Sequence, residues 1–226
     1  MLSIMSIAEN LHSIENGLQG TAARLVAVTK THPPEVLREA YDAGARVFGE
    51  NKVQEMVAKW EVLPKDIEWH LIGHLQSNKV KYIAPFVSLI HSVDSLKLLK
   101  EIDRQAEKAG RVIDCLLQVY IATEETKFGL SMEEAEELLL SDELASLEHI
   151  RIVGLMGMAS NTDSEEQVRA EFRSLKQFFD RMKVSLPVRA NCQLYELSMG
   201  MSGDYPLAVA EGSTLIRVGS AIFGAR

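Results

Sequence analysis

The heptapeptide Arg24-Leu-Val-Ala-Val-Thr-Lys30, followed at once by Thr31-His-Pro-Pro34, is the stretch from which the predicted fold follows. Leu25 to Val28 are apolar without alternation, which is typical of a strand that is covered on both faces. The lysine at its end has two interpretations. Lys30 can mark the point where the strand reaches water, with its stem packed and its head solvated. Alternatively, it is an amine nucleophile able to form Schiff bases, because desolvation disfavours the charged ammonium.

Seven further strand-like segments follow, and helical patterns separate them. Alternating strand–helix units imply a parallel sheet. Eight such units fit a (β/α)8 TIM barrel, which typically has about 250 residues. A doubly wound open sheet is the alternative, but no GxGxxG motif follows the first strand. The run contains no linker, so we expect a single domain over residues 1–226. The predicted strands are 24–30, 46–48, 67–73, 86–91, 112–120, 150–156, 194–197 and 214–218.

The helical patterns include one ahead of the first strand. Apolar residues at intervals of three and four over 4–18 predict an amphipathic helix packed outside the barrel. Asp94 is expected to cap the helix after the fourth strand, and Thr162 or Asp163 the long helix after the sixth. A helix entered from Gly49 is expected to run to about Trp60.

Composition limits the function classes. The chain has 226 residues, is 46% hydrophobic and 25% charged, and carries a net charge of −8. The acidic balance argues against nucleic acid or an anionic membrane as a partner. No apolar run approaches the roughly 20 residues that span a bilayer, and no signal peptide is visible. Cys115 and Cys192 form no metal or redox spacing. We therefore expect a cytoplasmic protein.

Two glycine- and serine-rich segments follow the last two predicted strands. They are Ser198-Met-Gly-Met-Ser-Gly203 and Arg217-Val-Gly-Ser220. Barrels of this type often bind phosphate in the loops after strands 7 and 8, where amides at a helix start attract anions. Each segment alone could be an ordinary turn, and Arg217 could be a solvated surface group. Together with Lys30, however, they describe a pyridoxal phosphate (PLP) pocket, which needs an amine, phosphate donors and a partner for the ring nitrogen.

Six motifs carry a family resemblance that spans residues 25–224. They are Leu25-Val-Ala-Val-Thr-Lys30, Phe48-Gly-Glu-Asn-Lys-Val-Gln-Glu55, Trp69-His-Leu-Ile-Gly-His-Leu-Gln-Ser-Asn-Lys79, Gly154-Leu-Met156, Leu197-Ser-Met-Gly-Met-Ser-Gly-Asp204 and Arg217-Val-Gly-Ser-Ala-Ile-Phe-Gly224. With them the chain resembles the pyridoxal phosphate homeostasis proteins, which are related to the alanine racemase N-terminal (fold-type III) barrel.

The resemblance implies a role for each matching residue. Lys30 would carry PLP as a covalent internal aldimine, and Arg217 would face the pyridine nitrogen. Met158 would lie where fold-type III enzymes stack a residue on the ring. Asn51 is a plausible neighbour of the cofactor or, alternatively, a simple helix N-cap. The phosphate would be held by Ser202, by Ser198 as a possible helper, and by the amides of Gly219 and Ser220.

The same resemblance bears on catalysis. The racemases take a second base from a C-terminal β domain of a partner subunit, and this chain is expected to end at Arg226 without one. None of its five tyrosines is obviously placed as that base. Arg217 can only donate and so leaves the ring a weak electron sink, although the racemases share this device. The leading hypothesis is a non-catalytic, monomeric PLP carrier that buffers PLP or delivers it to PLP-dependent apo-enzymes. A PLP-dependent racemase or lyase, and a cofactor-free Schiff-base aldolase acting on a phosphorylated sugar, are the alternatives.

Other polar groups receive simpler interpretations. His70, His74 and His91 lie near strand ends but match no known metal spacing, so a structural role is favoured. Lys127 could be a second amine for transient cofactor handling, but a loop lysine among acidic neighbours is preferred. The acidic stretch 133–137 is expected to be a solvated helix face.

Overall fold

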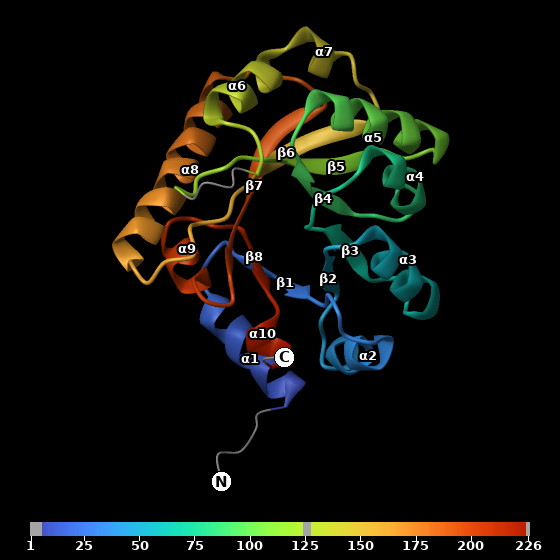
Figure 1. Cartoon of the computed structure of the whole chain (residues 1–226), viewed down its shortest axis with the longest axis vertical. Helices are drawn as coiled ribbons and strands as arrows, with labels where there is room; N and C mark the ends of the chain where they lie inside the picture. Colours follow the sequence, from blue (N-terminus) through green and yellow to red (C-terminus); the bar gives the residue numbers. More distant parts are fainter. Residues whose placement is uncertain (1–5, 124–127, 225–226) are drawn as a thin grey trace.

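The computed structural model describes residues 6–123 and 128–224, which form a closed barrel of eight parallel strands (Figure 1). Each strand pairs with the next along the chain, and the last pairs with the first to close the sheet. This confirms the predicted (β/α)8 fold over the open sheet. The strands are β1 (Arg24–Val28), β2 (Val47–Glu50), β3 (Glu68–Leu71), β4 (Leu89–Val93), β5 (Ile113–Gln118), β6 (Ile150–Met156), β7 (Cys192–Met201) and β8 (Leu215–Val218).

Helices surround this barrel and connect its strands (Figure 1). They are α1 (Ile7–Leu18), α2 (Pro34–Asp42), α3 (Val53–Val62), the 3₁₀ turn η1 (Ser77–Lys79), α4 (Val80–Ile83), α5 (Leu96–Lys108), α6 (Met132–Leu140), α7 (Asp142–Ala145), α8 (Glu165–Ser185), α9 (Tyr205–Ala210) and α10 (Ser220–Phe223). None of the helices in the described part of the chain is long and apolar enough to cross a membrane.

The additional helix α1 lies outside the barrel, as predicted. It begins at Ile7, where Ser6 forms a capping box with Glu9; the predicted start at residue 4 lies outside the described residues. The helix packs against α10, and the side-chain amide of Asn10 donates to the carbonyl of Ile222 at 2.9 Å. The first helix of the chain therefore supports the last one.

The buried apolar residues form two layers. The larger cluster fills the space between the strands and the helices, with Phe48, Trp69 and Phe172 among its largest members. A smaller cluster fills the inside of the barrel, where alternate side chains of the strands meet. It consists of Val26, Leu89, Leu116, Val153, Met156 and Leu215. The centre of the barrel is thus packed, and only its ends are open to ligands.

Some predicted bounds were wrong. Strand β6 has the predicted range, but β1 ends at Val28, so Lys30 lies in the turn that follows. Strand β4 starts at Leu89 rather than at residue 86, because the amides of Phe86 and Val87 bond to Ile83 and finish the preceding helix. Strand β2 runs to Glu50, and α3 accordingly begins at Val53 instead of following Gly49.

Strand β7 extends further than the predicted 194–197. Residues 198–201 look like a loop because they include Ser198 and Gly200, and the φ of Gly200 is +101°. They continue to pair with β8 across a register shift, with Ser198 opposite Leu215 and Met201 opposite Arg217. A side chain at position 200 would meet Ala208 at 2.6 Å, so this glycine lets α9 pack against the strand.

Two predicted helix caps were also wrong. Ser95, rather than Asp94, accepts from the amide of Leu98 at the start of α5. Ser164, rather than Thr162 or Asp163, caps α8 through the amide of Gln167. In both cases the capping serine lies one or two residues beyond the predicted acidic or threonine cap.

Candidate functional site

A cavity of about 560 Å³ opens at the carboxyl ends of the strands. Small-molecule sites typically have volumes of roughly 300–1,000 Å³. All the predicted site residues except Ser198 line this cavity, and they come from the loops after β1, β2 and β6 and from the end of the sheet at β7 and β8. The lining residues are Val28, Lys30, His32, Asn51, Ile72, Met158, Met201, Ser202, Gly203, Arg217, Gly219, Ser220 and Gly224.

Lys30 lies two residues beyond the end of β1, in a turn at the edge of the cavity. The next residue, Thr31, has a φ of +67°. A residue with a Cβ rarely adopts this left-handed conformation, so surrounding contacts must hold it. His32 also lines the cavity, and its ring lies 4.8 Å from that of Phe223 in α10. The turn therefore connects the start of the barrel to its last helix.

An anion cradle lies across the cavity, formed by Ser202, Gly203, Gly219 and Ser220. The Oγ of Ser202 accepts from the amides of Gly219 at 3.1 Å and Ala221 at 3.4 Å. A Cβ on Gly219 would lie 3.1 Å from the carbonyl oxygen of Val28, so glycine lets this segment approach β1 closely. A Cβ on Gly203 would meet nothing within 4 Å, so space remains beside these donors. Hydroxyls and backbone amides of this kind are suited to a phosphate group.

Arg217 forms part of the cavity floor and is only 4% exposed. Its Nη1 donates to Ser198 Oγ at 2.5 Å and its Nη2 to the carbonyl of Gly157 at 3.2 Å. Burial lowers the pKa of the guanidinium to about 10, although the charge of Asp204 acts in the opposite direction. The group therefore remains protonated at neutral pH. These bonds to described residues use two of its five N–H groups, so donors remain for a ligand.

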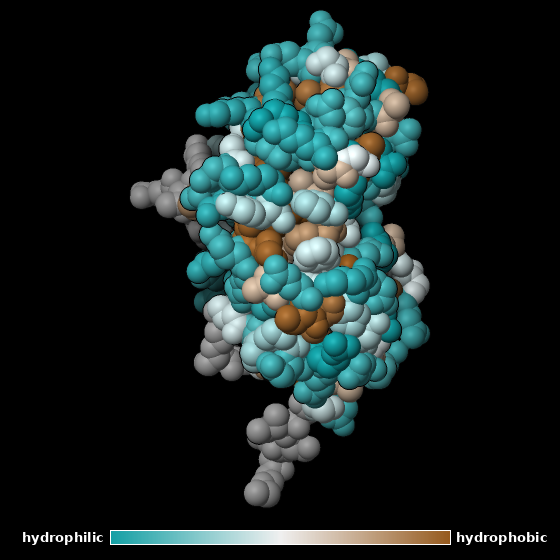
Figure 2. Space-filling view, turned by 90° about the vertical axis from the view of Figure 1, so that its right-hand side faces the viewer, coloured by the Kyte–Doolittle hydropathy of each residue, from teal (hydrophilic) through white to brown (hydrophobic). Residues whose placement is uncertain are grey.

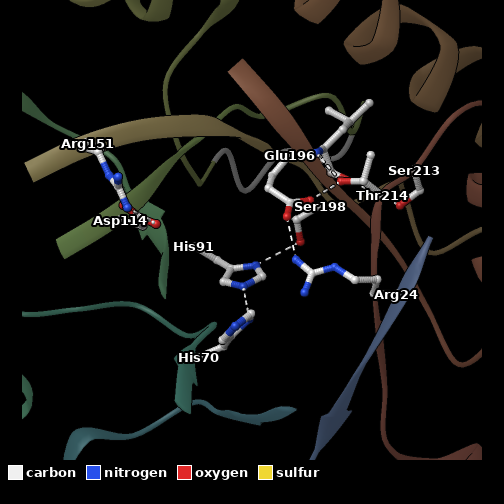
Figure 3. Close-up of polar contacts among 10 residues, drawn as sticks. Arg24, His70, His91, Asp114, Arg151, Glu196, Ser198, Ser213 and Thr214 are labelled. Carbon is white, nitrogen blue, oxygen red and sulfur yellow. Dashed lines mark hydrogen bonds and ion pairs between the residues drawn. The ribbon is translucent and has the colours of Figure 1, made fainter. Parts of the chain in front are cut away.

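Ser198 does not line the cavity, and its predicted help in holding a phosphate stays a prediction. Its side chain is fully buried, and Oγ lies 2.9 Å from Nδ1 of His91. The Nε2 of His91 in turn lies 2.9 Å from Nδ1 of His70, and Figure 3 shows this row inside the barrel. Because Arg217 donates to Ser198, the hydroxyl can donate to His91, and His91 can then donate to His70. Ser198 therefore holds the guanidinium of Arg217 by a hydrogen bond from inside the barrel.

Both histidines of this row are held neutral. Burial lowers the pKa of His70 to about 3, with a smaller contribution from the charge of Arg24. Burial, the neighbouring His70 and the charge of Arg217 together lower the pKa of His91 well below its ordinary value. Arg217 is thus supported by neutral groups and keeps its positive charge for the cavity.

Within the described residues, no group of three or more His, Cys, Asp or Glu side chains is arranged to hold a metal ion. His70 and His91 belong to the row below Arg217. His74 lies outside it, with Nδ1 3.7 Å from Asp94. Lys127, considered as a second amine, lies outside the described residues.

Asn51 and Met158 both face the cavity. The alternative interpretation of Asn51 as a helix cap is wrong, because α3 begins after Lys52 and has no side-chain cap. A Cβ on Gly73 would lie 2.4 Å from the carbonyl oxygen of Asn51, so glycine lets the loops after β2 and β3 cross closely. Met158 is 37% exposed at the rim.

None of the five tyrosines lines this cavity. Tyr120 lines a neighbouring cavity of about 210 Å³, which shares Met158 and Met201 with the main one. Tyr41 bonds to Asp66 at the protein surface. A tyrosine base is therefore not part of the main cavity among the described residues.

A buried ionic cluster beneath the Lys30 turn was missed by the sequence analysis. We call Glu50, Glu55 and Lys59 the clamp. The Nζ of Lys59 donates to the carbonyl of Thr29 at 2.7 Å, to Glu55 at 2.8 Å and to Glu50. The only signal was the i, i+4 spacing of Glu55 and Lys59, which usually marks an exposed helical pair. The clamp is nevertheless largely buried, because α3 packs against the turn after β1.

The surface beside the barrel is mostly hydrophilic. In Figure 2 the apolar side chains gather in separate small patches, without forming a continuous band.

Comparisons with known proteins agree on the family. The model of the alanine racemase N-terminal domain matches residues 2–226 of this chain. The pyridoxal phosphate homeostasis protein of Aquifex aeolicus (strain VF5) is 42% identical over 205 residues, which cover 90% of this chain and 87% of that protein.

Solved structures give the same result. PipY of Synechococcus elongatus PCC7942, solved without PLP, is 42% identical with a TM-score of 0.89, and the match covers 97% of this chain and 100% of that chain. The structure of PipY with PLP bound is 40% identical with a TM-score of 0.86, at 97% and 100% coverage.

Proposed function

This chain belongs to the alanine racemase N-terminal domain family and, within it, to the pyridoxal phosphate homeostasis proteins, and we propose that it binds PLP and serves intracellular PLP homeostasis. The observation that carries this proposal is that one cavity brings together Lys30, the anion cradle and Arg217. An amine, a phosphate site and a donor for the ring nitrogen are the three groups that PLP requires. PipY, a relative with the same fold, has been solved with PLP bound.

We propose that Lys30 holds PLP covalently. Its neutral amine would add to the aldehyde carbon, and the carbonyl oxygen would leave as water, so that a C=N bond forms without any oxidant or reductant. The phosphate would be held by the hydroxyls of Ser202 and Ser220 and by the amides of Gly219 and Ser220. Met158 and Asn51 would lie beside the ring, since both line the cavity.

Arg217 suits a carrier, although it does not exclude an enzyme, because the racemases share this device. Because its pKa of about 10 keeps it protonated at neutral pH, it can only donate to the ring nitrogen. The ring then stays unprotonated and withdraws electrons weakly, which limits reactions of bound amino acids. Among the described lining residues of the cavity there is no tyrosine to act as a second base. We therefore propose buffering or delivery of PLP to apo-enzymes, by a monomer in the cytoplasm.

An absorption spectrum tests the covalent site. Wild-type protein with PLP should show a Schiff-base band that is absent from Lys30→Ala and present in an exposed control on α5 such as Lys97→Ala. Borohydride should fix PLP on wild-type protein but not on Lys30→Ala. Wild-type protein without such a band would overturn the proposal. Trapping by sugar phosphates but not by PLP would instead favour the aldolase.

A second experiment tests the carrier role. Holo-protein is incubated with a panel of L- and D-amino acids, and products are measured alongside transfer of PLP to an apo-enzyme. We expect transfer without sustained turnover. Sustained turnover would replace the carrier by the racemase or lyase alternative.

A further inference from the structure

The clamp holds the turn that carries Lys30 from beneath. Lys59 is 3% exposed, and its ammonium has three N–H donors. All three have acceptors, namely the carbonyl of Thr29 and one carboxylate oxygen each from Glu50 and Glu55. A lysine buried in this way has no freedom to reach the cavity itself, and it fixes the backbone one residue before Lys30.

The two carboxylates of the clamp bind the other polar groups of the turn. The hydroxyl of Thr29 donates to Glu50 Oε1 at 2.6 Å. The amide of Thr31 donates to Glu55 Oε1. Lys30 is therefore flanked on both sides by residues that the clamp holds, and the left-handed backbone of Thr31 is one of them.

The bonds of the clamp, rather than its charges, point to a positioning role, because they converge on the turn that carries Lys30. Burial raises the pKa of Glu50, and its Oε2 has no hydrogen-bond partner among the described residues. Burial also raises the pKa of Glu55, but bonds from Lys59 and Thr31 outweigh it and leave that pKa below its ordinary value. Buried ionic groups are often replaceable by apolar ones without loss of stability, so their presence alone is weak evidence of a stabilising role. Their directional bonds, in contrast, converge on one turn.

We propose that Glu50, Glu55 and Lys59 are positioning residues that set how fast Lys30 forms its bond to PLP. This inference rests on the proposed function, because it concerns the condensation of the Lys30 amine with the aldehyde and the release of water. None of the three clamp residues lines the cavity or belongs to the anion cradle, and their side chains bond to the carbonyl and hydroxyl of Thr29 and to the amide of Thr31, so we infer that they act through residues 29–31. Misplacement of a reacting group by about 1 Å can slow a reaction by about 100-fold.

Glu55 offers the cleanest test because its side chain is partly exposed, at 24%, and its removal should leave the fold intact. Glu55→Ala removes the acceptor for Thr31, Glu55→Gln retains an oxygen acceptor, and Glu61→Ala is an exposed control on the same helix. Two quantities are measured for each protein. One is the rate of Schiff-base formation with PLP, followed by absorbance. The other is the affinity for pyridoxine 5′-phosphate, whose alcohol cannot form an imine.

We expect Glu55→Ala to form the Schiff base about 10-fold or more slowly than wild type. Glu55→Gln should recover most of the rate, and Glu61→Ala should match wild type. The affinity for pyridoxine 5′-phosphate should stay within about twofold in all variants, because the cradle and Arg217 are unchanged. A structural defect would instead lower rate and affinity together.

Three results would overturn the inference: an unchanged rate in Glu55→Ala, a parallel loss of pyridoxine 5′-phosphate affinity, or equal slowing in Glu55→Gln and Glu55→Ala. The measurement on wild-type protein distinguishes failure of this inference from failure of the proposed function. If wild-type protein forms no Schiff base, the covalent site itself is wrong and the clamp has no such role. If wild type forms it and Glu55→Ala does so equally fast, only the clamp's role is refuted.

Discussion

Replacing Ser198 by alanine tests whether the row below Arg217 is needed. The Ser198 hydroxyl accepts from the buried guanidinium at 2.5 Å and lies 2.9 Å from His91. A hydrogen bond to a charged group contributes about 1.5–3 kcal/mol and a neutral one about 1 kcal/mol. The substitution leaves both partners buried, so the free energy of unfolding should fall by about 2.5–4 kcal/mol. For a chain of this size, that corresponds to a decrease in Tm of roughly 5–15 °C.

A matched control comes from strand β4 of the same barrel. Ser92 is also buried, at 1% exposed, but its Oγ has no hydrogen-bond partner among the described residues. Ser92→Ala should therefore be neutral or stabilise by up to about 1 kcal/mol, because an unpaired buried hydroxyl is unfavourable. The assay is thermal and urea unfolding of both variants without PLP, at equal m-values. If Ser198→Ala costs no more than Ser92→Ala, the row does not support Arg217 as described.

Two further predictions follow from burial. Because burial lowers the pKa of His70 to about 3 and that of His91 well below its ordinary value, the unfolded chain binds protons that the folded protein cannot. This contribution to the free energy of unfolding is fully present above about pH 6.5. As the pH falls below that value, the free energy of unfolding should decrease by up to about 1.4 kcal/mol per pH unit for each histidine. Urea midpoints between pH 7 and 5 measure this decrease, and a His91→Gln variant with the same pH dependence as wild type would contradict it. Burial also raises the pKa of Cys192 to about 11 and that of Cys115 further, so neither thiol should react with a thiol reagent until urea is added, and stoichiometric labelling of native protein would refute this.

The sequence was most informative where local pattern and fold agree. In the continuous apolar run Leu25–Val28, residues 26–28 are buried and Leu25 is half-buried, as a strand between two layers requires. Strand β6 has the predicted bounds because it pairs with β5 from Ile150 to Met156, with one register shift between Ile152 and Gly154. Lys30 and Arg217 could be assigned to one rim because the carboxyl ends of all strands in such a barrel meet there.

The errors have a common cause in contacts between distant segments. Ser198 looks like a loop serine, yet pairing with β8 turns it into a buried support for Arg217. Glu55 and Lys59 look like a surface helical pair, but both bond to the turn after β1, and Lys59 is buried there while Glu55 stays partly exposed. Local sequence specifies neither which strand lies beside a residue nor which backbone group reaches its side chain.

The pairing of β8 with β1 places the candidate site across the seam of the barrel. Lys30 follows the first strand, whereas Arg217 and Gly219 belong to the last strand and its end, so groups from distant parts of the chain must meet before the cavity exists. A ligand attached to Lys30 and held by the anion cradle would cross-link the first strand to the last one. Its binding would select chains whose barrels have closed and would retard their reopening, which links cofactor occupancy to resistance against proteolysis.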